Sequence, residues 1–261
     1  MKKLVIFVVG IFCFAAVYGE QAVFTGADFA PANDPVIKDA FKPLKPSVFS
    51  NGFIPADQTK SYKLSAKVKN LGKDPANILV GLRPFTAKKG YIYDRSINVV
   101  VGTDTVLAKD CASKDTSVFV KDASQWTKTP TKTVAFETDP SPAMKDLPTD
   151  LFVRGDVKEI KQIGDMWEIV MTAPIGYDYP IGTNVRAHAN GNTFIYPIIA
   201  TVKPGAEWIT LEGIINPSLG NESQAGTANW WRGTAMVKVF LDTPENANIL
   251  FGAIELTEKT E

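Results

Sequence analysis

The feature that most limits the fold of this chain is a period of two in its apolar and polar residues. Between Tyr62 and Lys69 every second residue is apolar, and lysines and a serine stand between them. Successive side chains of a β-strand point to opposite faces, so this pattern predicts a strand with one buried and one solvated face. The sequence contains no long amphipathic helical pattern. We therefore predict an all-β protein.

Pro and Gly turns separate further segments of strand character along the chain. Asn190-Gly191 favours a type I′ turn, which predicts a hairpin between Val185–Ala189 and Asn192–Tyr196. Five prolines between Pro31 and Pro55 predict an irregular or edge segment. The other predicted strands are Ile78–Leu82, Tyr91–Val101, Ser117–Val120, Thr133–Phe136, Trp167–Met171, Asn184–Ala189, Trp208–Ile215, Gly233–Leu241 and Ile249–Leu256.

The lengths of these strands run long, short and long again along the chain. This order predicts one β-sandwich over residues 20–261, interrupted by an inserted smaller β-subdomain at about residues 104–204. Two tandem domains are the competing division. No Ser/Gly linker separates two units in the sequence, and this favours the insertion.

The N-terminus has the pattern of a secretory signal peptide. Two lysines after Met1 are followed by an apolar run from Leu4 to Val17 and by Gly19. We expect residues 1–19 to be removed after Gly19 and the protein to be extracellular or periplasmic. An uncleaved membrane anchor is the alternative, but the run is shorter than the roughly 20 residues of a membrane-spanning helix.

Cysteine content and charge limit what stabilises the protein and what it binds. Cleavage after Gly19 removes Cys13 and leaves Cys111 alone, so no intramolecular disulfide can form and stability must come from packing. The 28 basic and 28 acidic residues balance. This balance predicts no nucleic-acid partner and no attraction to an anionic membrane.

Motifs for catalysis are missing from the sequence. It has no G-x-S-x-G, phosphate-loop, H-E-x-x-H or C-x-x-C motif, and His188 is the single histidine. Arg186, His188 and Asn190 share one strand face, an arrangement that could neutralise and deprotonate a uronate. We favour the alternative, in which Arg186 and His188 form the solvent face of the hairpin. Cys111 is predicted to be structural.

Aromatic residues form the most coherent candidate site. Trp230 and Trp231 stand beside Arg232, and on a strand one indole would fill the core while the other points outward. Tyr91 and Tyr93 are two residues apart, so on a strand they would point to the same face, and Arg83 and Arg95 are nearby in the sequence. Exposed aromatic rings stack on the apolar faces of sugars, and Arg satisfies their hydroxyls. The alternative is that these rings belong to the core, as we expect of Trp126, Trp167 and Trp208.

Five segments resemble the strands of one family, the carbohydrate-binding modules of the jelly-roll, galactose-binding-like type. They are Tyr62–Asn70, Asn77–Phe85, Trp208–Gly213, Arg232–Val239 and Asn248–Leu256. The resemblance implies a jelly-roll-like β-sandwich whose ligand is a polysaccharide or another glycan, with Tyr91, Tyr93, Trp230 and Trp231 as binding positions. Sugar-binding sandwiches often hold one structural calcium ion, for which Asp242 and Glu255 are the candidate ligands. No other cofactor is expected.

The sequence thus predicts a secreted, non-catalytic carbohydrate-binding protein, with Trp230, Trp231, Arg232, Tyr91 and Tyr93 in its site. We expect no insertion into a membrane after signal cleavage. A structural protein of the cell surface or extracellular matrix is the second hypothesis. A polysaccharide lyase or hydrolase that uses Arg186 and His188 is the third.

Overall fold

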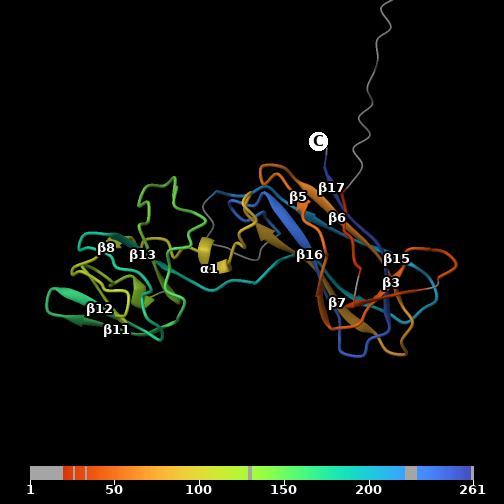
Figure 1. Cartoon of the computed structure of the whole chain (residues 1–261), viewed down its shortest axis with the longest axis horizontal. Helices are drawn as coiled ribbons and strands as arrows, with labels where there is room; N and C mark the ends of the chain where they lie inside the picture. The colour runs from red at the N-terminus through yellow and green to blue at the C-terminus, as the bar shows by residue number, and fades with distance from the viewer. Residues whose placement is uncertain (1–19, 26, 33, 129–130, 221–227, 260–261) are drawn as a thin grey trace, which may run out of the picture.

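The structure is a computed structural model, and it describes residues 20–25, 27–32, 34–128, 131–220 and 228–259. The predicted signal peptide, residues 1–19, lies outside the described residues. Figure 1 shows two lobes joined near the short helix α1 (Asp94–Ile97). Apart from α1 and a 3-10 turn, η1 (Trp126–Lys128), every regular element is a β-strand, so the all-β prediction is confirmed.

The first lobe is a sandwich of two antiparallel sheets, as predicted. One sheet has the order β15 (Ile209–Ile215), β6 (Tyr62–Asn70), β17 (Ile249–Glu258), β3 (Phe41–Pro43) and β2 (Phe29–Pro31), with β1 (Glu20–Gln21) beside β17. The other has the order β14 (Ile195–Val202), β7 (Ala76–Phe85), β16 (Met236–Asp242) and β4 (Ser47–Phe49), with β5 (Ile54–Pro55) beside β16.

Alternating residues of both sheets build the core between them. Leu64 and Val68 on β6 are fully buried, as are Val80 on β7 and Val239 on β16. The lysines between the apolar residues of β6 face outward, so the period of two places one face of each sheet inside. Burial of this apolar surface is the main stabilising contribution that the lobe has.

The second lobe has a separate core that runs from Val100 to Ala189 and includes Trp126. Phe136 and Tyr179 stack in this core with ring centroids 4.1 Å apart. Its two sheets have the orders β10–β13–β8 and β11–β12–β9. The strands are β8 (Thr105–Val106), β9 (Ser117–Val120), β10 (Thr133–Phe136), β11 (Val157–Ile163), β12 (Met166–Met171) and β13 (Asn184–His188).

The return to the first lobe comes earlier than the sequence suggests. The predicted insertion extends to about residue 204, but β14 pairs with β7 in the first lobe. The predicted hairpin across Asn190-Gly191 is also wrong. Gly191 N–H donates to Asp94 Oδ2, and neither Asn190 nor Gly191 is among the described residues with positive φ. Hydrogen bonds to α1 thus hold this segment extended between the lobes.

A second wrong prediction is the strand from Tyr91 to Val101. Tyr91 makes only an isolated bridge with Phe85, and the chain then enters α1. The predicted strand at Gly233 begins three residues later, at Met236, because Gly233 has φ +82° in a turn. The other predicted strands are present within one or two residues of their expected ends, with two exceptions: Ile78–Leu82 extends to Ala76–Phe85, and the strand expected at Asn192–Tyr196 is Ile195–Val202. Strand β11 was not predicted.

Candidate functional site

The structure buries both tryptophans of the predicted site. Trp230 is 0 % and Trp231 is 1 % exposed, so the expectation of one outward indole is wrong. The chain turns here, because Thr234 N–H donates to the Trp231 carbonyl oxygen at 3.1 Å. Opposite faces alternate only along an extended strand. Both rings therefore enter the core of the first lobe, and neither presents a face to a ligand.

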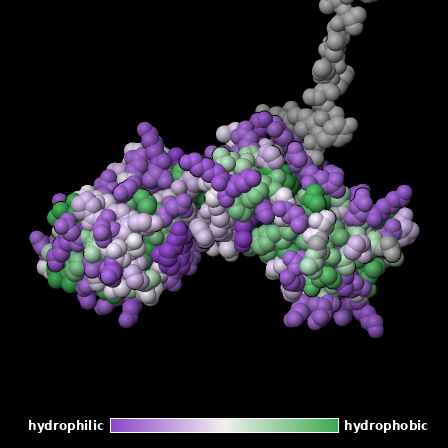
Figure 2. Space-filling view, in the orientation of Figure 1, coloured by the Kyte–Doolittle hydropathy of each residue, from purple (hydrophilic) through white to green (hydrophobic). Residues whose placement is uncertain are grey.

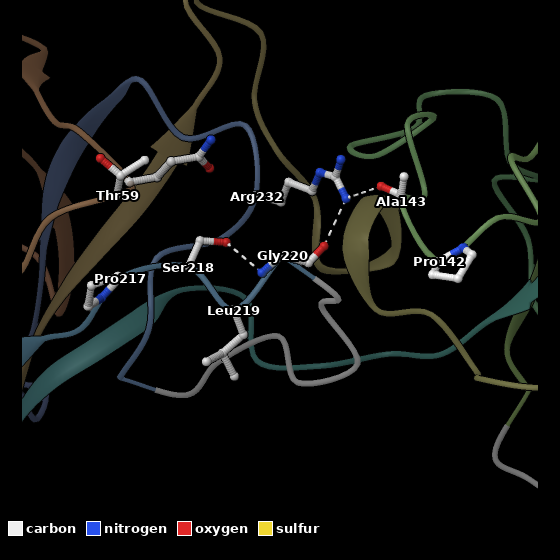
Figure 3. Close-up of a pocket in the computed structure, with 9 residues that line it drawn as sticks. Thr59, Pro142, Ala143, Pro217, Ser218, Leu219, Gly220 and Arg232 are labelled. Atoms are coloured by element: carbon white, nitrogen blue, oxygen red, sulfur yellow. Dashed lines mark hydrogen bonds between the residues drawn. The ribbon is translucent and has the colours of Figure 1, made fainter.

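Arg232 connects the two lobes. Its Nη1 donates hydrogen bonds of 2.8 Å to the carbonyl oxygens of Gly220 in the first lobe and Ala143 in the second lobe. Figure 3 shows these two bonds across a cavity of about 680 Å³. Two backbone carbonyls accept hydrogen bonds from this guanidinium, so Arg232 has a structural role at the junction. Arg232 and Tyr93 line different cavities.

The predicted tyrosines lie together at the junction of the lobes. Tyr91 and Tyr93 have ring centroids 4.4 Å apart and meet edge to face. Tyr91 is half-buried, and burial raises its pKa. Tyr93 is 41 % exposed. It borders a cavity of about 440 Å³, the Tyr93 pocket, lined by Tyr93, Asp94, Arg95, Phe152, Arg154, Gly155, Asp156 and Thr172.

Polar groups from both lobes surround the Tyr93 pocket. Arg95 donates from Nε to Asn190 Oδ1 at 2.6 Å and from Nη2 to Asp156 Oδ1 at 2.5 Å. Arg154 comes from the second lobe, and its guanidinium carbon lies 5.0 Å from the ring centre of Tyr93 and 4.4 Å from that of Phe152. The pocket therefore combines an exposed ring with hydrogen-bonding groups.

On the Tyr91 side, the aromatic surface continues over the outer face of the β14–β7–β16–β4 sheet. Arg83 on β7 is its centre, with a guanidinium carbon 4.1 Å from the ring centre of Phe49 and 4.8 Å from those of Tyr91 and Phe194. Arg83 follows Leu82 on β7, and because Leu82 faces the core, the Arg83 side chain points to the outer face of the sheet. We call this set the Arg83 surface: Phe49, Arg83, Tyr91, Phe194, Tyr196 and Phe240.

Arg186 and His188 lie beneath the junction, on one face of β13. Both are fully buried, so their predicted solvent exposure is wrong. The loop with Asp146 and the segment of Arg95 cover this face. Arg186 Nη2 donates to Asp146 Oδ2 at 2.6 Å, and His188 Nδ1 donates to the Arg95 carbonyl oxygen at 2.6 Å. Burial, together with the Arg186 charge, lowers the pKa of His188 to about 4.

The remaining predicted positions are distributed over the molecule. Asp242 lies on β16 and Glu255 on β17, which belong to different sheets, so the structure does not bring these two carboxylates together. No cluster of three or more His, Cys, Asp or Glu among the described residues could hold a metal ion. Cys111 is buried, and burial raises its pKa to about 11.

Among the described residues, no helix has the length and apolar character that crossing a membrane requires. Comparison of the chain with protein-family models, with curated proteins and with solved structures gives no match. Function must therefore be argued from the site itself.

Sequence reasoning missed Phe152 and Arg154 in the Tyr93 pocket. The two residues stand two positions apart, as Tyr91 and Tyr93 do, and both precede Gly155. A search for aromatic and basic residues at matching spacing would have found them. The contact between the two segments depends on how the second lobe folds back onto α1, which no local pattern contains.

Proposed function

We propose that this chain is an exported, non-catalytic glycan-binding protein whose ligand stacks on Tyr93 at the junction of the lobes. The 41 % exposure of Tyr93 beside a 440 Å³ cavity is the observation that carries this proposal. Ligand sites are typically concave, with a cavity of about 300–1,000 Å³ that combines apolar faces with a few polar groups. The predicted signal peptide, residues 1–19, supplies the route of export.

The composition of the Tyr93 pocket supports a sugar as the ligand. A sugar ring presents apolar C–H groups on its face and hydroxyls around its edge. Tyr93 offers an apolar face, while the exposed Asp156, Arg154 and Thr172 offer donors and acceptors at the rim. The resemblance of the strands to carbohydrate-binding modules points to the same ligand class.

Binding is favoured over catalysis by the location of the basic groups. Arg186 and His188, the residues of the lyase hypothesis, have no exposed surface on which a substrate could bind. His188 has a pKa of about 4 and is neutral at neutral pH. In the hydrogen bond to Arg95 it donates from Nδ1, while Nε2 faces the Arg186 guanidinium at 3.3 Å. This histidine stabilises the junction.

The test is the affinity of the purified protein for a panel of soluble polysaccharides, measured by titration calorimetry. Tyr93→Ala is expected to weaken binding about fivefold to 150-fold, since a stacked ring contributes roughly 1–3 kcal/mol in comparable aromatic sites. Tyr177→Ala is the matched control, because Tyr177 is 62 % exposed elsewhere on the second lobe. Equal loss in both variants, or no binding to any polysaccharide, would contradict the proposal.

Assembly through strand edges is the second candidate function. Strands β14 and β15 each pair on one side only among the described residues, and their edges lie side by side. Both carry exposed apolar residues, since Ile199 is 73 % and Ile209 is 41 % exposed. Because the two edges lie against each other, the exposed apolar side chains beside them, rather than free backbone groups, would carry association between chains. Concentration-dependent oligomers in sedimentation, without affinity for any glycan, would favour this function over the first.

A further inference from the structure

We infer that the glycan is anionic and that its carboxylate or sulfate groups pair with Arg83 and Arg154. This inference rests on the proposed glycan-binding function and names the chemical class of its ligand. It follows from the partners of the arginines and from the charges around each of them.

The chain has five arginines, and three of them have partners within the protein. Arg95 pairs with Asp156, and Arg186 pairs with Asp146 and Asp104. Arg232 donates to two backbone carbonyl oxygens. Within the described part of the chain, Arg83 and Arg154 form no ion pair and no hydrogen bond; aromatic rings alone hold their guanidinium groups. These two arginines are therefore available to a ligand.

Arg83 is held in place without being neutralised. Three rings fix its guanidinium plane, and its Nε is buried without a hydrogen-bond partner among the described residues. Such an unsatisfied donor costs about 1–3 kcal/mol, or more when the group is charged. Its cross-strand neighbour on β16 is Lys238, and like charges directly opposite one another destabilise a sheet. An anion bound at the accessible part of the Arg83 guanidinium would offset the repulsion between these like charges.

Arg154 is the second unpaired guanidinium, and it lies on the other side of the tyrosine pair. It is exposed and stacks on Tyr93, whereas Arg83 stacks on Tyr91. The separations along this path are 4.8 Å, 4.4 Å and 5.0 Å. The order is thus arginine, ring, ring, arginine. This order suits a polymer that carries several anionic groups and places a sugar ring against the exposed tyrosine.

The carboxylates of the same region are already engaged. Asp156 accepts from Arg95, and Asp94 accepts from the Gly191 backbone N–H. On the Arg83 side, Asp242 accepts from the Ser47 hydroxyl at 2.6 Å. None of them forms an ion pair with Arg83 or Arg154 in the described part of the chain. Arg95 neutralises Asp156, whereas Asp94 and Asp242 keep their charges because their donors are neutral. Arg83, Arg154 and Lys238, the cross-strand neighbour of Arg83, outnumber these two negative charges, and this excess of positive charge matches an anionic ligand.

The experiment compares each anionic polysaccharide with a neutral counterpart of the same backbone. Polygalacturonate and alginate are measured against their esters, and carrageenan against its desulfated form. The uronate and sulfate arms show which anion the site takes. The variants are Arg83→Gln and Arg154→Gln, with Lys158→Gln as the control that removes one exposed positive charge on β11. Thermal unfolding checks that each variant is folded, and Arg154 is exposed enough for its substitution to leave the core intact.

At least one anionic polymer is expected to bind at least about tenfold more tightly than its neutral counterpart. Each arginine substitution should weaken that binding about tenfold to a hundredfold, and Lys158→Gln should leave it unchanged. Equal affinity for the neutral counterpart, or arginine variants that bind like Lys158→Gln, would overturn the inference. If Tyr93→Ala still abolished binding in that case, the proposed function would stand; if no polymer bound at all, both would fail.

Discussion

Adjacent tryptophans with different hydrogen bonding provide a direct test of the first lobe's core. Trp230 and Trp231 are both buried, at 0 % and 1 % exposure. Trp230 Nε1 donates to the Lys60 carbonyl oxygen at 3.0 Å, and its ring meets Tyr62 edge to face with centroids 5.3 Å apart. Trp231 Nε1 has no hydrogen-bond partner among the described residues. Substitution by Phe therefore removes a satisfied donor at one position and an unsatisfied donor at the other.

The expected difference in the free energy of unfolding follows from these contacts. Both substitutions leave a similar cavity, which costs about 1 kcal/mol for a volume loss of roughly 40 Å³. Trp230→Phe also loses a hydrogen bond worth about 1 kcal/mol. Trp231→Phe instead relieves a desolvation penalty, whose lower bound of about 1 kcal/mol offsets the cost of the cavity. We therefore expect Trp230→Phe to destabilise the lobe by about 2 kcal/mol and Trp231→Phe to be close to neutral.

Thermal unfolding followed by far-ultraviolet circular dichroism measures this difference. In a domain of this size each kcal/mol shifts the midpoint by about 2–4 °C, so the two variants should differ by about 4–8 °C. Because two cores can unfold separately, the comparison uses the transition that changes in the Trp230 variant. Equal midpoints for the two variants would refute the argument from hydrogen bonding. Trp231→Phe as the less stable variant would refute it as well.

Two buried titratable groups give further predictions. The unfolded chain protonates His188 below pH 6.5 while the folded protein does so only near pH 4, so stability should fall by up to about 3 kcal/mol as pH drops through this window. His188→Gln should reduce the difference between the urea midpoints measured at pH 6.5 and at about pH 4. A variant whose midpoints still differ as much as those of the unmodified protein would count against this role. Cys111, whose pKa is about 11, should resist a thiol reagent at about pH 8 until denaturant is added. Rapid labelling of the native protein would contradict its burial.

The sequence predicted the parts of the fold that depend on local alternation. Strands β9 and β10 have the predicted ends, and β6 extends the predicted Tyr62–Lys69 by one residue. In β6 the polar and apolar residues fall on different faces, so local pattern and tertiary burial agree. All four residues of β10 are buried, and its β-branched and aromatic residues indicate the strand instead. The β11–β12 hairpin was missed at its first strand because β11 lies at a sheet edge and is mostly exposed, which leaves little apolar periodicity.

The junction between the lobes could not be predicted, because tertiary contacts override local preference there. Asn190-Gly191 has the composition of a tight hairpin turn, but Asn190 accepts from Arg95 and Gly191 donates to Asp94. Arg186 and His188 alternate on β13 as a solvent face would. The chain covers that face with α1 and the Asp146 loop, and both residues become part of a buried network. Period two defines which residues share a face, but it does not reveal what covers the face.

The same limit explains which part of the proposed site was predicted. Tyr91 and Tyr93 lie together at the junction, but the sequence could not show that both indoles are enclosed. Five arginines are equivalent in the sequence until the partner of each is known. Three of them bind groups from distant segments of the chain: Asp156, Asp146 and two backbone carbonyls. Arg83 and Arg154 remain, and both lie over aromatic rings. The charge available to a ligand is therefore a property of the folded chain, and it concentrates where the two lobes meet.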